Sequence, residues 1–214
     1  MHCGACARDL ALVRGLRALG HDVLVLPLYT PLRGDGAEAA PGRVFYSGVS
    51  VFLEQVWRGW QRPPAWLDRL LSSPRVLRAL AGHAVEVRAE RLGPLTVSVL
   101  AGGAGRQAWE LEKLLRYLET EERPDVVSLT NSLLSGIAPA VKARLGVPVV
   151  CSLQGEESFL GALPEPHRSQ AERLVRENAR AIDRFVAPSA AYAAQMAAFL
   201  GLSEEQVGVV PPGI

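Results

Sequence analysis

Two adjacent carboxylates, Glu156 and Glu157, follow an apolar run in the stretch SLQGEESF. A carboxylate can bind a sugar hydroxyl or accept its proton, so this pair could take part in acid–base chemistry. Gln154 and Gly155 stand directly before the pair and add an amide side chain and an open backbone. We predict Glu156 and Glu157 as catalytic residues and Gln154 and Gly155 as substrate-binding residues. The alternative is a solvated loop whose acids cap the following helix.

A second polar pair, Asn131 and Ser132, follows the apolar stretch DVVSLT. In open α/β sheets, ligands bind beyond the carboxyl ends of the strands, and both polar pairs fall at such positions. We therefore predict Asn131 and Ser132 as substrate-binding residues. Their alternative role is to cap the helix that comes next.

The N-terminal stretch Cys3-Gly-Ala-Cys6 permits two interpretations. It could be a redox-active pair at a helix N-terminus, where the helix dipole acidifies a thiol, or a short loop whose amides face a phosphate. The sequence has no second Cys-x-x-Cys and no His directly after Cys6, so the usual partners of a metal or haem site are missing. We favour the phosphate-facing loop, predict Gly4 as a substrate-binding residue and predict no metal site.

The stretch GAGRQA, which begins at Gly103, matches the G-x-G-x-x-A pattern of dinucleotide sites. It follows a predicted strand and precedes a predicted helix. The pattern also expects an acidic residue at the end of the next strand, and that strand ends at Thr130 and Asn131. We favour a surface loop. An NAD(P)-binding oxidoreductase that uses Gly103 and Gly105 is an alternative function.

These polar positions are separated by apolar stretches that alternate between strand-like and helix-like periodicity. Predicted strands cover residues 21–28, 43–46, 85–90, 95–101, 125–130, 147–153, 184–187 and 207–210, and predicted helices cover 6–18, 109–118, 133–145, 166–182 and 192–200, with two more between 51 and 80. Ser189 and Gly201 are expected to cap the two ends of the last helix. The alternation predicts an α/β fold, a Rossmann-like doubly wound parallel sheet with helices on both faces.

Composition limits the classes of function. The 214 residues carry 23 basic and 22 acidic side chains, a net charge of +1, which is unlike the strongly basic surface of a nucleic-acid binder. Three cysteines do not make a disulfide framework, and no apolar run is long enough to span a bilayer. We expect a cytoplasmic protein with no nucleic-acid partner.

A tryptophan-rich segment lies between residues 51 and 80. Trp57, Trp60 and Trp66 stand there among several arginines. Helix packing explains the aromatic residues, and the alternative is peripheral contact with the inner face of an anionic membrane.

Three stretches together resemble the N-terminal, acceptor-side domain of a family 4 glycosyltransferase of the two-Rossmann GT-B fold. They are CGACARDLALVRGLRALGHDVLVLPLY, RPDVVSLTNSLLSGIAPAVKARLGVPVVCSLQGEESFL and AIDRFVAPSAAYAAQMAAFLGLSEEQVGVVPPGI. The last is the most specific, because D-x-F-V-A-P-S, a helix and V-x-V-V-P-P-G-I resemble the family's approach to its interdomain hinge.

The resemblance implies transfer of a hexose from a nucleotide-sugar donor to a carbohydrate or lipid-linked acceptor, without a metal or other cofactor. It implies that Gly4 faces the donor's phosphates. It also implies that Asn131 and the loop from Gln154 to Glu157 border the acceptor and the reacting sugar. The chain departs from the family in having Gln154 near the position where many members carry a His.

The domain prediction follows from the same comparison. Residues 1–214 are expected to form one Rossmann-like domain, half of a GT-B fold, with a helical and hairpin insertion over 48–92. We expect that the first strand lies upstream of Met1 and that the C-terminal donor-binding domain, with its E-x7-E motif, is encoded elsewhere. On this hypothesis the chain is inactive alone. A rival hypothesis is a non-catalytic module that binds a sugar or a nucleotide.

Overall fold

The computed structural model describes residues 4–26, 28 and 89–212. The chain divides into two compact units, Met1–Glu86 and Val87–Ile214. The predicted strand at 43–46, the tryptophan-rich segment and most of the predicted insertion over 48–92 lie outside the described residues.

The described part of the first unit is a helix and the segment that follows it. Helix α1 spans Gly4–Ala18, in agreement with the helix predicted over 6–18. Gly20 has a φ of +89°, a conformation that glycine adopts without strain and that ends helices. The strand predicted over 21–28 is wrong for the described residues, where Val25 and Leu28 form only isolated bridges and Leu24 is exposed. Proline at position 27 has no amide hydrogen to continue a ladder.

The second unit is built on a parallel sheet of four strands in the order β1-β2-β3-β4. The strands are β1 (Val127–Leu129), β2 (Val149–Ser152), β3 (Arg184–Ala187) and β4 (Val207–Val209). In the register of the inner pair, Cys151 lies opposite Phe185. Both side chains are fully buried. The short apolar runs after Pro124 are therefore strands, as predicted.

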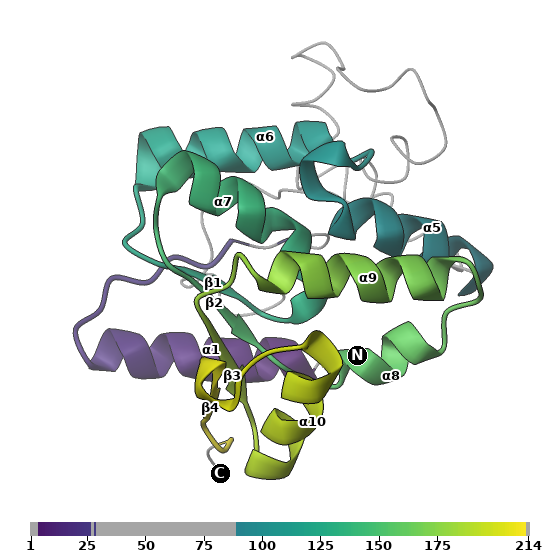
Figure 1. The fold of residues 1–214 in the computed structure, drawn as a ribbon. Helices are drawn as coiled ribbons and strands as arrows, with labels where there is room; N and C mark the ends of the chain where they lie inside the picture. Colours follow the sequence, from purple (N-terminus) through teal and green to yellow (C-terminus); the bar gives the residue numbers. More distant parts are fainter. Residues whose placement is uncertain (1–3, 27, 29–88, 213–214) are drawn as a thin grey trace, which may run out of the picture. The chain divides into compact units, whose positions relative to one another are not determined.

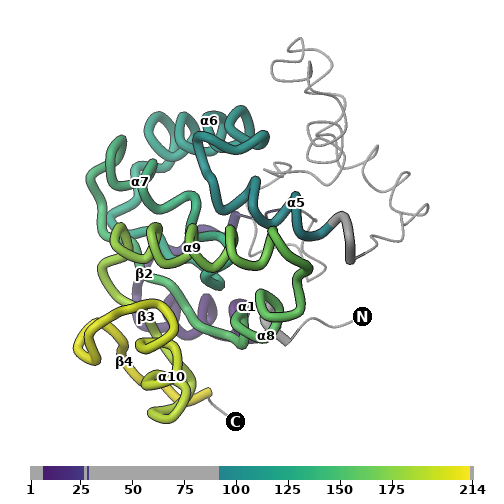
Figure 2. Tube along the Cα trace, turned by 45° about the vertical axis from the view of Figure 1, so that its right-hand side comes forward, coloured from purple at the N-terminus to yellow at the C-terminus, as the bar shows by residue number. Residues whose placement is uncertain are grey.

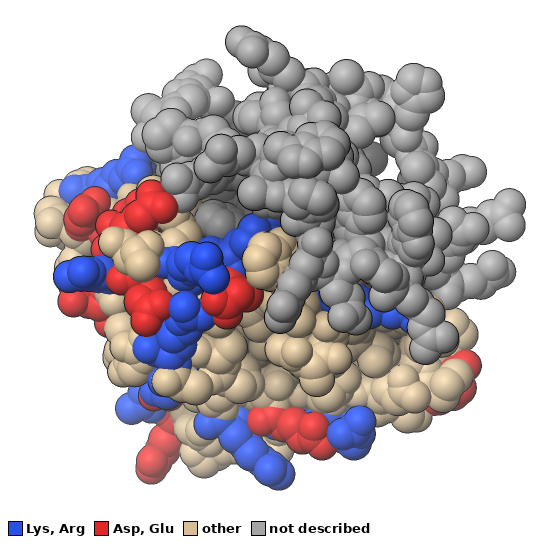
Figure 3. Space-filling model, turned by 90° about the horizontal axis from the view of Figure 1, so that it is seen from above, with Lys and Arg blue, Asp and Glu red and all other residues tan. Residues whose placement is uncertain are grey.

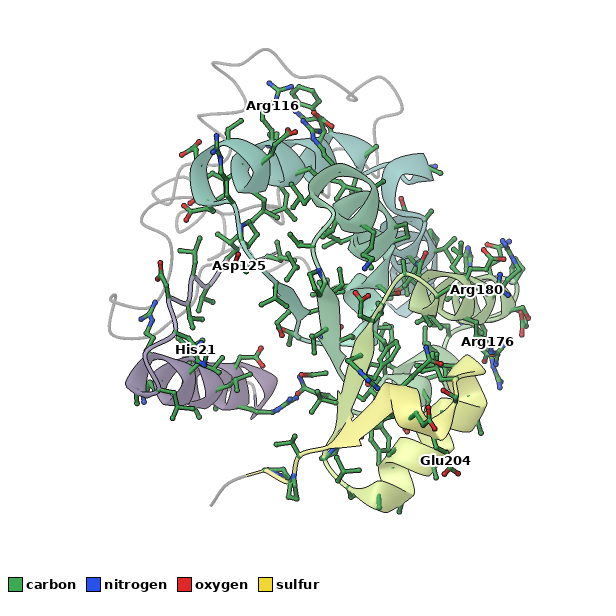
Figure 4. All side chains as sticks on the ribbon, turned by 60° about the vertical axis from the view of Figure 1, so that its left-hand side comes forward. His21, Arg116, Asp125, Arg176, Arg180 and Glu204 are labelled. Carbon is green, nitrogen blue, oxygen red and sulfur yellow. The ribbon has the colours of Figure 1, made fainter. Side chains whose placement is uncertain are left out.

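Helices connect and flank these strands. They are α5 (Ala89–Leu100), α6 (Ala108–Tyr117), α7 (Ala138–Leu145), α8 (Glu156–Gly161), α9 (His167–Ala179) and α10 (Ala190–Leu200), with shorter helical turns η1 (Gly102–Ala104), η2 (Leu118–Glu122), η3 (Ser132–Ile137) and η4 (Glu204–Gln206). Helix α9 packs alongside α5 (Figures 1 and 2). Helix α10 packs on β3 and β4, on the same side of the sheet as α9 (Figure 4). The predicted α/β class, a parallel sheet flanked by helices, is confirmed.

Helix α5 corrects the sequence prediction of two strands joined at Gly93 and the proline after it. Its buried positions Gly93, Thr96 and Leu100 recur at helical spacing and face α9 and η3. A side chain at position 93 would collide with the ring of His167, since an ideal Cβ there lies 2.8 Å from His167 Cγ. Packing against α9 therefore favours a helix here, and it outweighs the preference of the β-branched residues in this segment for a strand.

Both ends of α10 are capped as predicted. The Ser189 hydroxyl accepts a hydrogen bond from the Tyr192 amide at 3.2 Å, and Gly201 ends the helix with a φ of +70°. Met196 and Leu200 are buried from α10. The helix is therefore fixed at both termini and along its inner face.

The outer surface carries mixed charge. On the face shown in Figure 3, the described Lys and Arg side chains lie next to Asp and Glu side chains. One such cluster is Arg144, which pairs with Glu112 and Glu119 at 2.8 Å each. Among the helices in the described part of the chain, none combines the length and apolar character needed to cross a bilayer.

Candidate functional site

Three polar loops meet at the carboxyl ends of β1, β2 and β3. The loop after β1 contacts the loop after β2 twice. The Gln154 side-chain amide donates to the Thr130 carbonyl at 2.6 Å, and the Ser132 amide donates to Glu156 Oε1 at 2.8 Å. The two polar pairs that the sequence predicted as separate parts of a site are thus brought together.

Glu156 lies inside this junction and is only 4% exposed. Its Oε1 accepts from the Ser132 amide, and its Oε2 accepts from the Gln154 amide at 2.6 Å. Both oxygens of this carboxylate are therefore bound to backbone amides of two different loops. Hydrogen bonds to an ionised carboxylate are stronger than bonds between neutral groups, so Glu156 holds the loops together.

Glu157, the next residue, is half-buried. Its Oε2 accepts a hydrogen bond from the Tyr192 hydroxyl at 2.7 Å. Among the described residues, its Oε1 makes only long contacts, at 3.3 Å, with the Ser158 hydroxyl and the Gln195 side-chain amide. One oxygen of Glu157 is thus firmly oriented, and the other keeps the capacity to accept a further hydrogen bond.

Tyr192 is a residue of the site that the sequence analysis missed. It lies in the first turn of α10, after β3, and its hydroxyl also accepts a hydrogen bond from the Gly155 amide at 2.6 Å. Burial, the hydrogen bond to Glu157 and the negative charge of Glu156 raise the pKa of the Tyr192 phenol. The signal in the sequence is its position beyond the carboxyl end of the predicted strand over 184–187. From the sequence alone, this stretch is assigned only to the capping of the following helix.

The other predicted site residues, Asn131, Ser132, Gly155 and Gly4, differ in their surroundings. The Asn131 side-chain oxygen accepts from the Leu133 amide at 3.1 Å, which is the helix-capping alternative of the sequence analysis. Ser132 is 1% exposed, and its hydroxyl has no hydrogen-bond partner among the described residues. Gly155 caps α8 with a φ of +95°. Gly4, which was predicted in a loop before the first helix, is instead the first residue of α1 in the other unit.

The glycine motif that begins at Gly103 has a different role from the one its pattern indicates. It follows helix α5, so the strand predicted before it is wrong and the strand–turn–helix context of a dinucleotide site is absent from this described segment. An ideal Cβ at Gly105 would lie 1.9 Å from the Ser98 carbonyl oxygen, and one at Gly102 would lie 2.2 Å from that of Gly136. These glycines permit close packing of backbone, and nothing in the structure supports the oxidoreductase alternative.

The three loops are rich in hydrogen-bond acceptors and contain no Lys or Arg within residues 130–133, 153–158 and 188–192. Such an edge suits a ligand that presents hydroxyl groups. These three loop segments do not themselves supply the cationic side chains that usually bind a diphosphate. Within the part of the chain that the structure describes, no three His, Cys, Asp or Glu residues are grouped to hold a metal ion.

Comparison with known proteins identifies the family. No curated protein matches the chain. A family model described as a glycosyl transferase 4-like domain matches residues 4–213, which is nearly the whole sequence. This match agrees with the resemblance carried by the three stretches of the sequence and with the parallel α/β fold. The chain belongs to the glycosyl transferase 4-like domain family.

Proposed function

We propose that this chain is the acceptor-side half of a glycosyltransferase that transfers a hexose from a nucleotide sugar to a carbohydrate or lipid-linked acceptor. The family match supports sugar transfer in general. The observation that carries the assignment of the acceptor side lies at the carboxyl ends of β1, β2 and β3, where the oriented Glu157 carboxylate stands among hydrogen-bond acceptors in three loops whose own sequences contain no Lys or Arg. Open α/β sheets bind their ligands at this edge.

The two glutamates take different roles in this proposal. Glu157 binds the acceptor through its less occupied oxygen and accepts the proton of the attacking hydroxyl. Glu156, with both oxygens on backbone amides, keeps the loops after β1 and β2 in place. Asn131 and Gln154 border the bound sugar. Only Glu157 is therefore expected to touch the reacting hydroxyl.

The donor side needs groups that these loops do not supply. Charge that develops on the leaving diphosphate must be stabilised by positive charge or hydrogen-bond donors. Gly4, at the N-terminus of α1, is proposed to face the phosphates, since helix N-termini bind anions. The remaining hydrogen-bond donors and positive charges are proposed to come from a separate domain that binds the nucleotide sugar. On this proposal the chain alone does not catalyse sugar transfer. With a lipid-linked acceptor, Trp57, Trp60 and Trp66 are the proposed contact with the inner face of the membrane.

Binding and turnover by the 214-residue chain test the proposal. Methyl α-D-glucopyranoside and methyl α-D-mannopyranoside serve as neutral probes, and the shift of the Gly155 amide signal reports binding. We expect one of these hexosides to bind and Glu157→Gln to weaken it about tenfold, because a hydrogen bond to a charged group is lost. Glu204→Gln is the matched control, since Glu204 is exposed on η4 before β4.

Turnover is measured as release of nucleoside diphosphate from a panel of nucleotide sugars. The rate of nucleoside diphosphate release in the presence of the isolated chain is expected to equal the rate without protein. Equal affinity of wild type and Glu157→Gln for the hexosides would argue against the role of Glu157. Absence of hexoside binding would contradict the acceptor-side assignment, and turnover by the isolated chain would contradict the need for a donor-binding domain.

A further inference from the structure

One hydroxyl group, that of Tyr192, connects the loop after β3 with the loop after β2. It accepts from the Gly155 amide at 2.6 Å and donates to Glu157 Oε2 at 2.7 Å, while Glu156 Oε2 lies 3.4 Å away. A phenol has a single proton to donate. The shorter distance assigns that proton to Glu157, so the donor and the acceptor function of this hydroxyl are both used within the candidate site.

The hydrogen bond to Gly155 acts on the backbone that aims Glu157. Gly155 has a φ of +95°, which turns the chain out of β2 and into α8. Glycine adopts this conformation easily, but it also adopts many others. A hydrogen bond from its amide to a fixed partner selects one of them. Because Glu157 is the second residue of α8, its carboxylate depends on this turn for its direction.

Tyr192 is itself held firmly. Its amide donates to the Ser189 hydroxyl, and its helix packs on β3 and β4 with Met196 completely buried. The raised pKa of its phenol extends the pH range in which the hydroxyl is protonated further above neutral pH. The orientation of Glu157 is thus set by α10, an element that follows a different strand of the sheet.

We propose that Tyr192 is a positioning residue that aligns the Glu157 carboxylate and the Gly155 turn for a hydroxyl-bearing sugar acceptor. The inference rests on the proposed function, in which Glu157 binds that acceptor. Tyr192 acts through Glu157: it occupies Oε2 and leaves Oε1, whose contacts are 3.3 Å long, for the hydroxyl of the sugar.

The first test measures amide hydrogen exchange by NMR in the free 214-residue chain. Tyr192→Phe keeps the ring and removes the hydroxyl, so exchange at Gly155 is expected to become about tenfold faster. Tyr117→Phe is the matched control. It removes a hydroxyl that donates to Glu122, beyond the end of α6, and should leave Gly155 unchanged. Unchanged exchange at Gly155 in Tyr192→Phe would overturn the positioning role.

A second variant covers the case in which Tyr192→Phe does not fold. Ser189→Ala removes the cap that holds the Tyr192 amide and loosens the first turn of α10. It is expected to raise exchange at Gly155 by a smaller factor. The positioning role is overturned if Gly155 exchanges at the wild-type rate in this variant.

The second test is a double-mutant cycle on binding of the hexoside probes. Tyr192→Phe should weaken binding about as much as Glu157→Gln, and the double variant should bind no worse than either single variant, because both act on one contact. If the double variant loses as much binding free energy as the two single variants together, the proposal that Tyr192 acts through Glu157 is overturned. If wild type binds no hexoside, the proposed function fails, while faster exchange at Gly155 still establishes that Tyr192 fixes this turn.

Discussion

At the start of α8, two consecutive glutamates lie in opposite surroundings. Neighbouring helical residues point about 100° apart around the axis. Glu156 consequently enters the junction of two loops, and Glu157 remains half-buried beside Tyr192. The sequence showed that a carboxylate stands at the end of a buried strand. It could not show which of the two is covered, because that depends in part on the backbone amide of Ser132, in a loop 24 residues away.

This difference predicts unequal effects on stability. Glu156→Ala leaves the Ser132 and Gln154 amides without their acceptor in a buried position, and we expect the free energy of unfolding to fall by about 3 kcal/mol. Glu157→Ala, at the half-buried position, is expected to cost about 1 kcal/mol or less. Urea unfolding followed by circular dichroism measures both values. Equal losses would show that the amide contacts of Glu156 do not stabilise the junction.

At the level of elements, the least predictable region is α5 and the turns around it. Helix α8 was not predicted from the sequence. The four strands after Pro124 and helices α7, α9 and α10 follow from their apolar periodicity and capping residues, since these elements are short and clearly separated. Helix α5 does not, because its apolar, β-branched segment and its Gly93 are typical of a hairpin. Contacts with α9 and η3 decide its conformation, and Asn178 of α9 donates to the Leu100 carbonyl at the end of α5 at 2.8 Å.

The glycines of this region yield a prediction with an internal control. An ideal Cβ at Gly136 lies 2.2 Å from the Val99 carbonyl oxygen, so Gly136→Ala forces two backbone segments apart and should lower the free energy of unfolding by about 2–3 kcal/mol. At Gly103 the described structure places no atom within 4 Å of the added carbon. Gly103→Ala should therefore change stability by less than about 0.5 kcal/mol. If these glycines serve close packing, Gly136→Ala must destabilise the chain more than Gly103→Ala. Chemical denaturation of the two variants measures both losses.

For the second unit as a whole, the two ends of the sheet serve different purposes. Polar loops gather at the carboxyl ends of the strands, and a structural ion pair lies at the amino ends. There, the Asp183 carboxylate accepts from the Val149 amide at 2.7 Å and pairs with Lys142 at 2.8 Å, which ties β2, β3 and α7 together. The fold class and the gathering of polar loops at the carboxyl ends of the strands could be predicted from the alternation of strands and helices along the chain. Such ties between distant segments could not, because single charged residues carry no periodic signal.

The ion pair between Asp183 and Lys142 makes the stability of the chain depend on pH. The hydrogen bond to Lys142 and that from the Val149 amide lower the pKa of Asp183 in the folded chain. Its contribution to stability is therefore present above the unfolded value of about 3.9 and is lost as the pH falls through the lowered folded value. Asp183→Asn should destabilise the chain at pH 7 and have less effect at pH 3, measured by urea unfolding. Asp125→Asn, at an exposed aspartate before β1, is the control, and a pH-independent difference for Asp183→Asn would contradict the assignment.

Cys151 offers a way to observe motion beneath the candidate site. Its thiol is completely shielded in β2, the inner strand from whose end Gln154 and the two glutamates extend. A thiol reagent can modify it only when that strand is transiently uncovered. In a background in which Cys3 and Cys6 are replaced by serine, the labelling rate would measure how often β2 is uncovered. Comparing that rate with and without a hexoside would show whether a ligand at the proposed site slows the opening.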